Sequence, residues 1–217
     1  MDTQVQRRPI GQNEDILILY QNIESALPNV KKAIQFVACC QKAGTTTIVR
    51  EFAKVCHHVF NRTVLLMERA VDASFSGCET SLVVSADTAV NVEGHPLEID
   101  NCLNQIYDKR MTSHLITLSG ESLSLIFTSR DIGYFMNNIK LKFDYILVDS
   151  PPIGSSSEAL SIAGSVDSTI LVIEAESTRW QLAANAKKRI EQAGGNVLGV
   201  LLNKQRYYIP KFIYDRL

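Results

Sequence analysis

Five short runs of apolar, mostly β-branched residues recur along the chain and restrict what it can fold into. They lie at 35–40, 63–67, 145–148, 169–173 and 197–202. Each run is hydrophobic almost throughout, which is typical of strands that are covered on both faces of a parallel sheet. Residues 46–60 and 179–193 carry apolar side chains at helical spacing and fall between such runs. The order of strand, helix and strand predicts an α/β fold with a mostly parallel central sheet and helices on both faces.

Length, charge and cysteine content narrow the class of protein. The 217 residues suit one α/β domain over 1–217, with a segment of different character at 204–217. The 22 basic residues balance 23 acidic ones, so the overall charge gives no support to a nucleic-acid partner. The five cysteines contain no Cys-x-x-Cys pair and predict neither a zinc site nor a disulfide framework. The polar N-terminal residues and the short apolar runs predict a cytoplasmic location.

Other elements are indicated outside these runs. A helix is predicted at 15–27, where Pro28 follows, and another at 99–109. Residues 115–120 have the composition of a further strand and turn. The surrounding segment 74–123 is polar, and its residues indicate no chemistry.

The loop after the first apolar run has most features of a phosphate-binding loop. It reads Cys-Gln-Lys-Ala-Gly-Thr-Thr-Thr over 40–47 and leads into a predicted helix. In such loops glycine lets backbone N–H groups surround a phosphate, lysine supplies positive charge, and a Ser or Thr hydroxyl binds magnesium. Gly44 and Thr46 occupy two of these places, whereas Thr45 stands where the lysine is expected and Lys42 replaces an upstream glycine. An ordinary strand-to-helix turn is the alternative, and Lys42 is a candidate substitute for the missing cation.

An aspartate directly follows the apolar run at 145–148. Asp149 is followed by Ser-Pro-Pro at 150–152. Because ligands bind outside the carboxyl ends of parallel strands, Asp149 is placed to hold a magnesium ion or its water. The alternative is an aspartate that caps the next turn, with the prolines stiffening it. The unusual Asp-Ser-Pro-Pro run favours the site.

Together these segments resemble the bacterial tyrosine kinases (BY-kinases), cytoplasmic P-loop ATPases that accompany polysaccharide chain-length regulators. The same larger group holds the plasmid-partition and septum-placement ATPases. The matching pieces cover nearly the whole chain and lie at 36–47, 63–68, 143–152, 158–159, 166–173 and 194–203, with the helix around Tyr20. The resemblance implies a nucleotide pocket for ATP or ADP with Mg²⁺. It also implies a place at the inner face of the membrane through a membrane-embedded chain-length regulator.

The resemblance assigns roles to individual residues. Asp149 corresponds to the Walker B aspartate and Glu68 to the first of two carboxylates after the second strand, so both are candidate catalytic residues. Thr46 and Asp149 are the candidate metal ligands. The candidate nucleotide-binding residues are Lys42, Ala43, Gly44, Thr45, Thr46, Thr47 and Asn203. Ala70 stands where the family has its second carboxylate, and this loss, together with Thr45, puts nucleotide and Mg²⁺ in doubt.

Two features bear on assembly and on the tail. Family members carry a glutamate and two arginines on the first helix to join subunits into a ring, whereas Ile18, Gln21 and Glu24 stand there in this chain. The sequence therefore leaves undecided whether the chain forms a homo-oligomer, and the subunit ring of the family is doubtful. The tail at 204–217 is basic and aromatic, and its candidate phosphorylation sites are Tyr207, Tyr208 and Tyr214. The alternative for the tail is a short helix that packs on the domain or on a partner.

Three functional hypotheses follow from these residues. The preferred one is a catalytically impaired, regulatory BY-kinase-like protein of exopolysaccharide biosynthesis or export. The second is an active ATP-dependent tyrosine autokinase, favoured by Asp149, Thr46 and the tail tyrosines. The third is a partition- or positioning-type ATPase switch, which fits the fold but not the tail.

Overall fold

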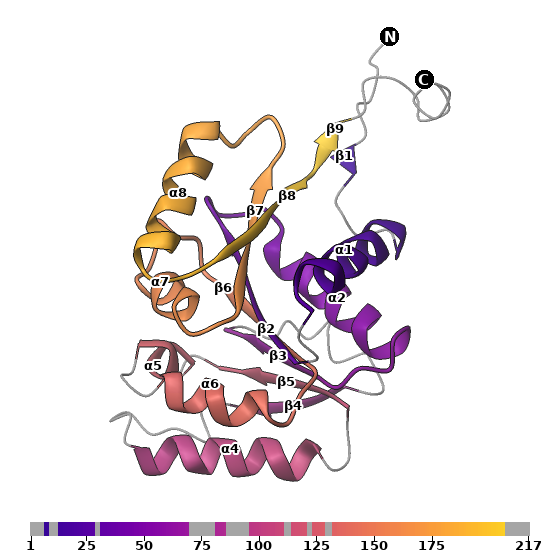
Figure 1. Cartoon of the computed structure of the whole chain (residues 1–217), viewed down its shortest axis with the longest axis vertical. Helices are drawn as coiled ribbons and strands as arrows, with labels where there is room; N and C mark the ends of the chain where they lie inside the picture. The colour runs from indigo at the N-terminus through magenta and orange to yellow at the C-terminus, as the bar shows by residue number, and fades with distance from the viewer. Residues whose placement is uncertain are drawn as a thin grey trace.

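Seven parallel strands form the centre of the protein in the computed structural model, which describes residues 7–8, 13–28, 31–69, 81–85, 96–110, 114–120, 123–128 and 132–206. The order across the sheet is β4-β5-β3-β6-β2-β7-β8, and each neighbouring pair runs parallel. The strands are β2 (Lys32–Ala38), β3 (Val64–Glu68), β4 (Ser81–Ser85), β5 (Leu115–Ser119), β6 (Tyr145–Ser150), β7 (Ser168–Glu174) and β8 (Val197–Asn203). The predicted parallel α/β sheet is thus confirmed (Figure 1).

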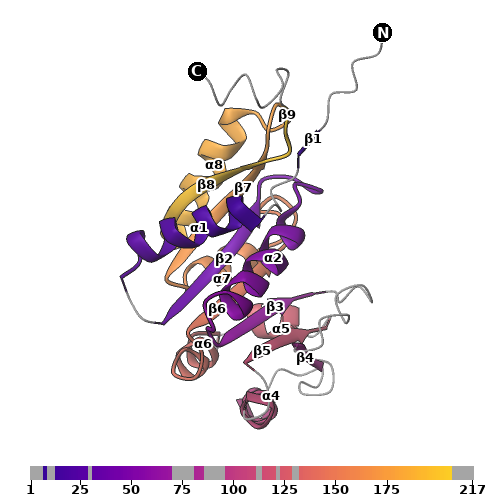
Figure 2. The ribbon, with the colours of Figure 1, turned by 90° about the vertical axis from the view of Figure 1, so that its right-hand side faces the viewer.

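Helices cover both faces of this sheet, as the sequence predicts. Two of them, α1 (Asn13–Ala26) and α2 (Thr45–His58), pack on one face (Figure 2). The opposite face is covered by α4 (Pro96–Arg110), α5 (Leu123–Thr128), α6 (Ile132–Lys140), α7 (Glu158–Ala163) and α8 (Trp180–Gln192). None of the helices in the described part of the chain is long and apolar enough to cross a membrane.

The first strand of the sheet begins and ends earlier than predicted. The sequence places it at 35–40, whereas β2 spans Lys32–Ala38 and is buried along its whole length. The sequence does not predict the start of this strand because Lys32 is polar. In the structure its ammonium is nevertheless buried against the Glu24 carboxylate, at 3.1 Å. Cys39 and Cys40 then belong to the loop that follows.

The two ends of the described chain meet in a small antiparallel pair. Strand β1 (Arg7–Arg8) pairs with β9 (Gln205–Arg206), which directly follows β8 (Figure 1). The tail tyrosines Tyr207, Tyr208 and Tyr214 lie outside the described residues, so their roles stay predictions.

Candidate functional site

The loop between β2 and α2 curls tightly at the carboxyl edge of the sheet. Lys42 and Gly44 both have positive φ, of 63° and 88°, which turns successive backbone N–H groups toward a common side. Helix α2 starts at Thr45, and no side chain caps its first turn. The buried stripe of α2, which includes Ile48 and Phe52, packs against the sheet and fixes the helix N-terminus at this edge. The N–H groups of the first turn therefore face the pocket as anion-binding donors.

Asn203 and Lys204 hold this loop from behind. The Asn203 Nδ2 donates to the carbonyl oxygen of Ala43 at 2.7 Å, and the Lys204 ammonium donates to the carbonyl oxygen of Lys42. A Cβ atom at Gly44 would lie 2.4 Å from the Asn203 Nδ2, so only glycine fits. The family resemblance makes Asn203 a candidate nucleotide-binding residue. The structure places it beneath the loop, where it is buried and does not line the cavity.

Replacing Asn203 tests this bracing role. Asn203→Ala removes the donor to the Ala43 carbonyl, and we expect the free energy of unfolding to fall by about 1–3 kcal/mol. Urea denaturation followed by circular dichroism measures it. Asn138 is a matched control because its exposed amide donates to a carbonyl of its own helix, and Asn138→Ala should cost less than about 0.5 kcal/mol. Equal stability of both variants would contradict the assignment.

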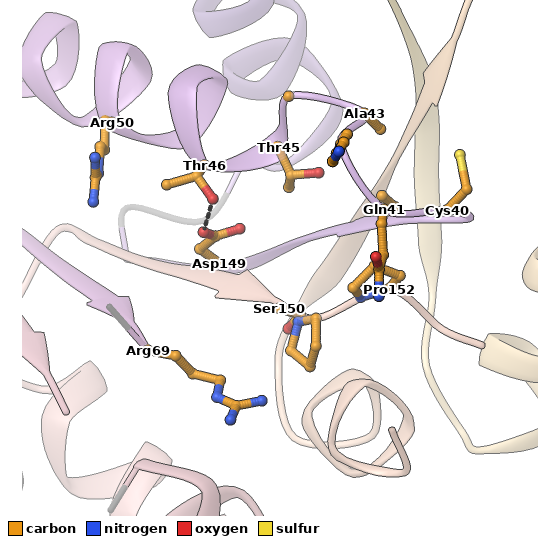
Figure 3. A pocket seen from close by; sticks show the side chains of 14 residues that line it. Cys40, Gln41, Ala43, Thr45, Thr46, Arg50, Arg69, Asp149, Ser150 and Pro152 are labelled. Atoms are coloured by element: carbon orange, nitrogen blue, oxygen red, sulfur yellow. Dashed lines mark hydrogen bonds between the residues drawn. The ribbon is translucent and has the colours of Figure 1, made fainter. Parts of the chain in front are cut away.

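Thr46 and Asp149 meet in front of the loop. The Thr46 hydroxyl donates to the Asp149 Oδ2 at 2.6 Å, and both side chains line the same cavity (Figure 3). Burial raises the pKa of Asp149 to about 6, although the hydrogen bond from Thr46 opposes this shift. The predicted meeting of the glycine loop and this carboxylate at one edge of the sheet is therefore present in the structure.

Glu68 lies beside the cavity and faces Arg50. Its carboxylate is buried and accepts two hydrogen bonds from the guanidinium, from Nε at 2.8 Å and from Nη2 at 3.2 Å. Arg50 stands one helical turn after Thr46, on the same face of α2, and itself lines the cavity. The sequence proposes Glu68 as a catalytic carboxylate. The structure gives it a buried ion pair instead of a place in the cavity lining.

The cavity has a volume of about 410 Å³, within the range of roughly 300–1,000 Å³ that is usual for small-molecule sites. Its lining comes from Ala38, the loop and first turn at 40–46, Arg50 of α2, Arg69 after β3, and the turn at 149–152 (Figure 3). Lys42, Ala43, Gly44, Thr45, Thr46 and Asp149 are the predicted site residues that it brings together. Thr47, Asn203 and Glu68 are not part of this lining. Sequence reasoning did not single out Arg50 and Arg69.

A parallel sheet whose glycine loop runs into a helix N-terminus, opposite an aspartate at the end of the adjacent strand, defines a P-loop NTPase fold. Solved structures agree. The chain aligns with the kinase domain of Escherichia coli tyrosine kinase ETK with a TM-score of 0.65 and 17% identity, over 91% of this chain and 77% of that one. It aligns with the septum site-determining protein MinD of Pyrococcus horikoshii, solved with Mg-ADP, with a TM-score of 0.51 and 19% identity. That alignment covers 79% of this chain and 69% of MinD.

Sequence similarity to tyrosine-protein kinases is confined to part of the chain. Over 66 residues, the chain is 44% identical to the tyrosine-protein kinase CpsD of Streptococcus agalactiae serotype III (strain NEM316). The aligned stretch is 30% of this chain and only 28% of that relative. No family model matches the chain. The chain is thus similar to tyrosine-protein kinase CpsD over this stretch, and it shares the P-loop fold of a solved tyrosine kinase domain.

Proposed function

We propose that this chain is a BY-kinase-like regulatory protein that binds a nucleotide in the cavity between the loop and Asp149 but transfers its phosphoryl group poorly. The observation that carries the proposal is the hydrogen bond of 2.6 Å between Thr46 and Asp149, next to a loop in which Thr45 replaces the lysine. The hydroxyl of the loop and the carboxylate of the neighbouring strand thus contact each other, whereas the lysine that is the main cation of a P-loop is absent.

Binding is supported by what the cavity offers to a phosphate. Uncapped N–H groups at the N-terminus of α2 attract anions, and the helix dipole adds to this attraction. Arg50 and Arg69 bring guanidinium groups to the lining, each with a carboxylate partner, Glu68 and Glu158. MinD carries Mg-ADP in a fold of this kind, which is consistent with a nucleotide here.

Poor transfer is supported by what the site lacks. Phosphoryl transfer depends on positioning and on neutralising the charge that develops on the phosphate. Thr45 has no charge, Glu68 is held by Arg50, and the sequence has Ala70 where the family has its second carboxylate. Losing one lysine contact weakens binding by about 10- to 100-fold, whereas losing the lysine and a carboxylate together reduces turnover further.

The proposed biological setting is supported by the relatives. CpsD is a tyrosine-protein kinase, and the family resemblance couples such proteins to membrane chain-length regulators in exopolysaccharide synthesis. We infer the same setting, with the protein held at the inner face of the membrane by the regulator's cytoplasmic segment. Glu24 bears on assembly because it accepts hydrogen bonds from Lys32 and from the Tyr145 hydroxyl, so it faces inward. This inward role argues against the family's ring contact at that position.

An active autokinase is the second candidate, favoured by the intact Thr46–Asp149 pair. The regulatory proposal and the autokinase are distinguished by incubating the purified chain with ATP and Mg²⁺. ADP release and tail phosphotyrosine are then measured, the latter by mass spectrometry. The regulatory proposal expects no phosphotyrosine at Tyr207, Tyr208 or Tyr214 and ADP release at the background rate. Phosphotyrosine that disappears in Asp149→Asn would overturn it in favour of the autokinase.

Restoring the lysine should strengthen nucleotide binding. Thr45→Lys returns a charge-assisted contact to the phosphates, and we expect the affinity for ADP to rise by about 10- to 100-fold. Isothermal titration calorimetry measures the change. Asn185→Lys adds the same charge on the exposed face of α8 and should leave the affinity unchanged. An equal response of both variants would show that only the overall charge matters and would contradict the proposed position of the phosphates.

A further inference from the structure

The turn between β7 and α8 borders the phosphate-binding loop on the side away from β6, because β6 and β7 flank β2 on opposite sides. The Cys40 thiol, which belongs to the cavity lining, lies 3.8 Å from the Thr178 hydroxyl of this turn. The Ala175 N–H donates to the carbonyl oxygen of Asn203 at 2.9 Å. These contacts tie the turn at 175–179 to the loop and to the end of β8.

Lys204 connects the same three segments. Its ammonium forms an ion pair with Glu174 at the end of β7, at 3.4 Å, and donates to the carbonyl oxygen of Lys42 in the loop. The carboxyl ends of β2, β7 and β8 are thus joined into one rim beside the cavity. A nucleotide extends beyond its phosphates by a ribose and a base. When its phosphates lie over the first turn of α2, this rim is a surface on which the base can rest.

An exposed aromatic side chain follows the turn. Trp180 is the only tryptophan of the chain and the first residue of α8, two positions after Thr178. It is 74% exposed. Three positions later, on the adjoining part of the helix surface, Ala183 packs in one apolar cluster with Ile173 near the end of β7. Trp180 therefore lies level with the carboxyl ends of the strands instead of over the sheet, which accounts for its exposure.

The chemistry of this rim suits a nucleobase. A base has two flat π faces, and it stacks on an indole ring whatever its hydrogen-bonding pattern. On the other side of β2, Arg50, Arg69 and Asp149 make the cavity lining polar. Small-molecule sites combine apolar contacts with a few placed polar groups. The phosphates would thus use the polar part of the edge, and the base would use the indole.

We propose that Trp180 forms the base subsite of this protein, on which the base of a nucleoside di- or triphosphate stacks while its phosphates lie over the first turn of α2. The inference rests on the proposed nucleotide site. It adds the contact that distinguishes a nucleotide from a bare phosphate or pyrophosphate. The stacking contact is independent of the candidate metal ligands Thr46 and Asp149.

Two titrations of the full chain with ADP and Mg²⁺ test the inference. We expect ADP to quench the tryptophan emission, which comes from Trp180 alone, over the concentrations at which calorimetry shows binding. Trp180→Ala should weaken ADP binding by about 5- to 150-fold, the usual effect of removing a stacking partner from one base. Trp180→Phe keeps an aromatic ring and should recover most of the loss. Inorganic pyrophosphate has no base, so its affinity should be the same for all three proteins.

Leu141→Ala is the matched control. It removes a side chain that is 68% exposed, ahead of the first residue of β6 and thus at the opposite edge of the sheet, and it should bind ADP like the unmodified protein. The inference is wrong if Trp180→Ala binds ADP as well as Leu141→Ala does, or if ADP binds without changing the emission. An equal loss of pyrophosphate affinity in Trp180→Ala would also contradict it, since the role of Trp180 would then be structural. Absence of calorimetric ADP binding to the unmodified protein would instead overturn the proposed nucleotide site, and the inference with it.

Discussion

Arg50→Met is expected to lower the free energy of unfolding by about 3–5 kcal/mol, the usual cost of removing one partner from a buried ion pair. Glu68 is 1% exposed, and Arg50 gives it two hydrogen bonds in a fork geometry. Without the guanidinium, this carboxylate would stay in the interior without its main counter-charge, or it would take up a proton. Chemical denaturation at neutral pH, followed by circular dichroism, measures the loss.

A double variant distinguishes a structural role of Glu68 in an ion pair from a role as a catalytic acid. Arg50→Met combined with Glu68→Leu removes both charges and fills the same space with apolar atoms. Such a replacement is often neutral or stabilising by about 1–4 kcal/mol relative to the intact pair. We therefore expect the double variant to regain most of the stability that Arg50→Met loses. If the single variant costs less than about 1 kcal/mol, or the double is as unstable as the single, Glu68 does not serve mainly as the partner of Arg50.

Asp149→Asn is expected to stabilise the protein by about 1–3 kcal/mol at neutral pH. Burial raises the pKa of Asp149 from 3.8 to about 6, so the folded state holds its proton more tightly than the unfolded state. This contribution favours folding at low pH and is lost as the pH rises from about 4 to about 6. Above that range the charged carboxylate destabilises the fold. Asparagine carries no charge and keeps an oxygen for the Thr46 hydroxyl.

Unfolding by urea at acidic and at neutral pH, in EDTA and without nucleotide, gives the two stabilities to compare. The difference between Asp149→Asn and the unmodified protein should be small well below pH 4 and largest above pH 6. Asp108→Asn, at an exposed position of α4, is the matched control and should show no such pattern. A variant that is less stable than the unmodified protein at neutral pH would contradict the account of Asp149 as a desolvated carboxylate. A carboxylate kept at such a cost is typical of a functional site.

The strands that form the sheet centre could be predicted because their burial leaves a continuous apolar signal. Residues 145–148 and 197–202 correspond to β6 and β8 within one or two residues. Helix α6 was missed although its buried side chains Ile132, Phe135, Met136 and Ile139 follow helical spacing. That helix is only 9 residues long, and a short periodic segment carries little weight against its polar surroundings. The order of the strands came from the structure.

The site could be predicted in outline for a different reason. Parallel strands end at a common edge, so a glycine loop after one strand and Asp149 after its neighbour had to come close. The partners of the other residues depend on side-chain geometry that the sequence does not contain. Glu68 could face the cavity or α2, and only the position of Arg50 on the same helix face as Thr46 decides between them. Asn203 likewise became a brace for the loop because β8 ends beneath Ala43.

These residues give a consistent picture of an altered P-loop protein. The fold and the contact between Thr46 and Asp149 are those of a P-loop protein, while Thr45 stands where the lysine is expected and the carboxylate of Glu68 forms an ion pair with Arg50. Such changes remove charge stabilisation from phosphoryl transfer more than they remove donors for a bound phosphate. Under the proposed function, such a protein would respond to nucleotide concentration without consuming the nucleotide.

A crystal structure of the full chain grown with saturating ADP tests the central claim most directly. We expect the diphosphate over the first turn of α2, within hydrogen-bond distance of the N–H groups of Thr45 and Thr46 and facing Asp149. A cavity without nucleotide under these conditions, or ADP bound at another surface, would contradict the claim that this edge of the sheet is a nucleotide site.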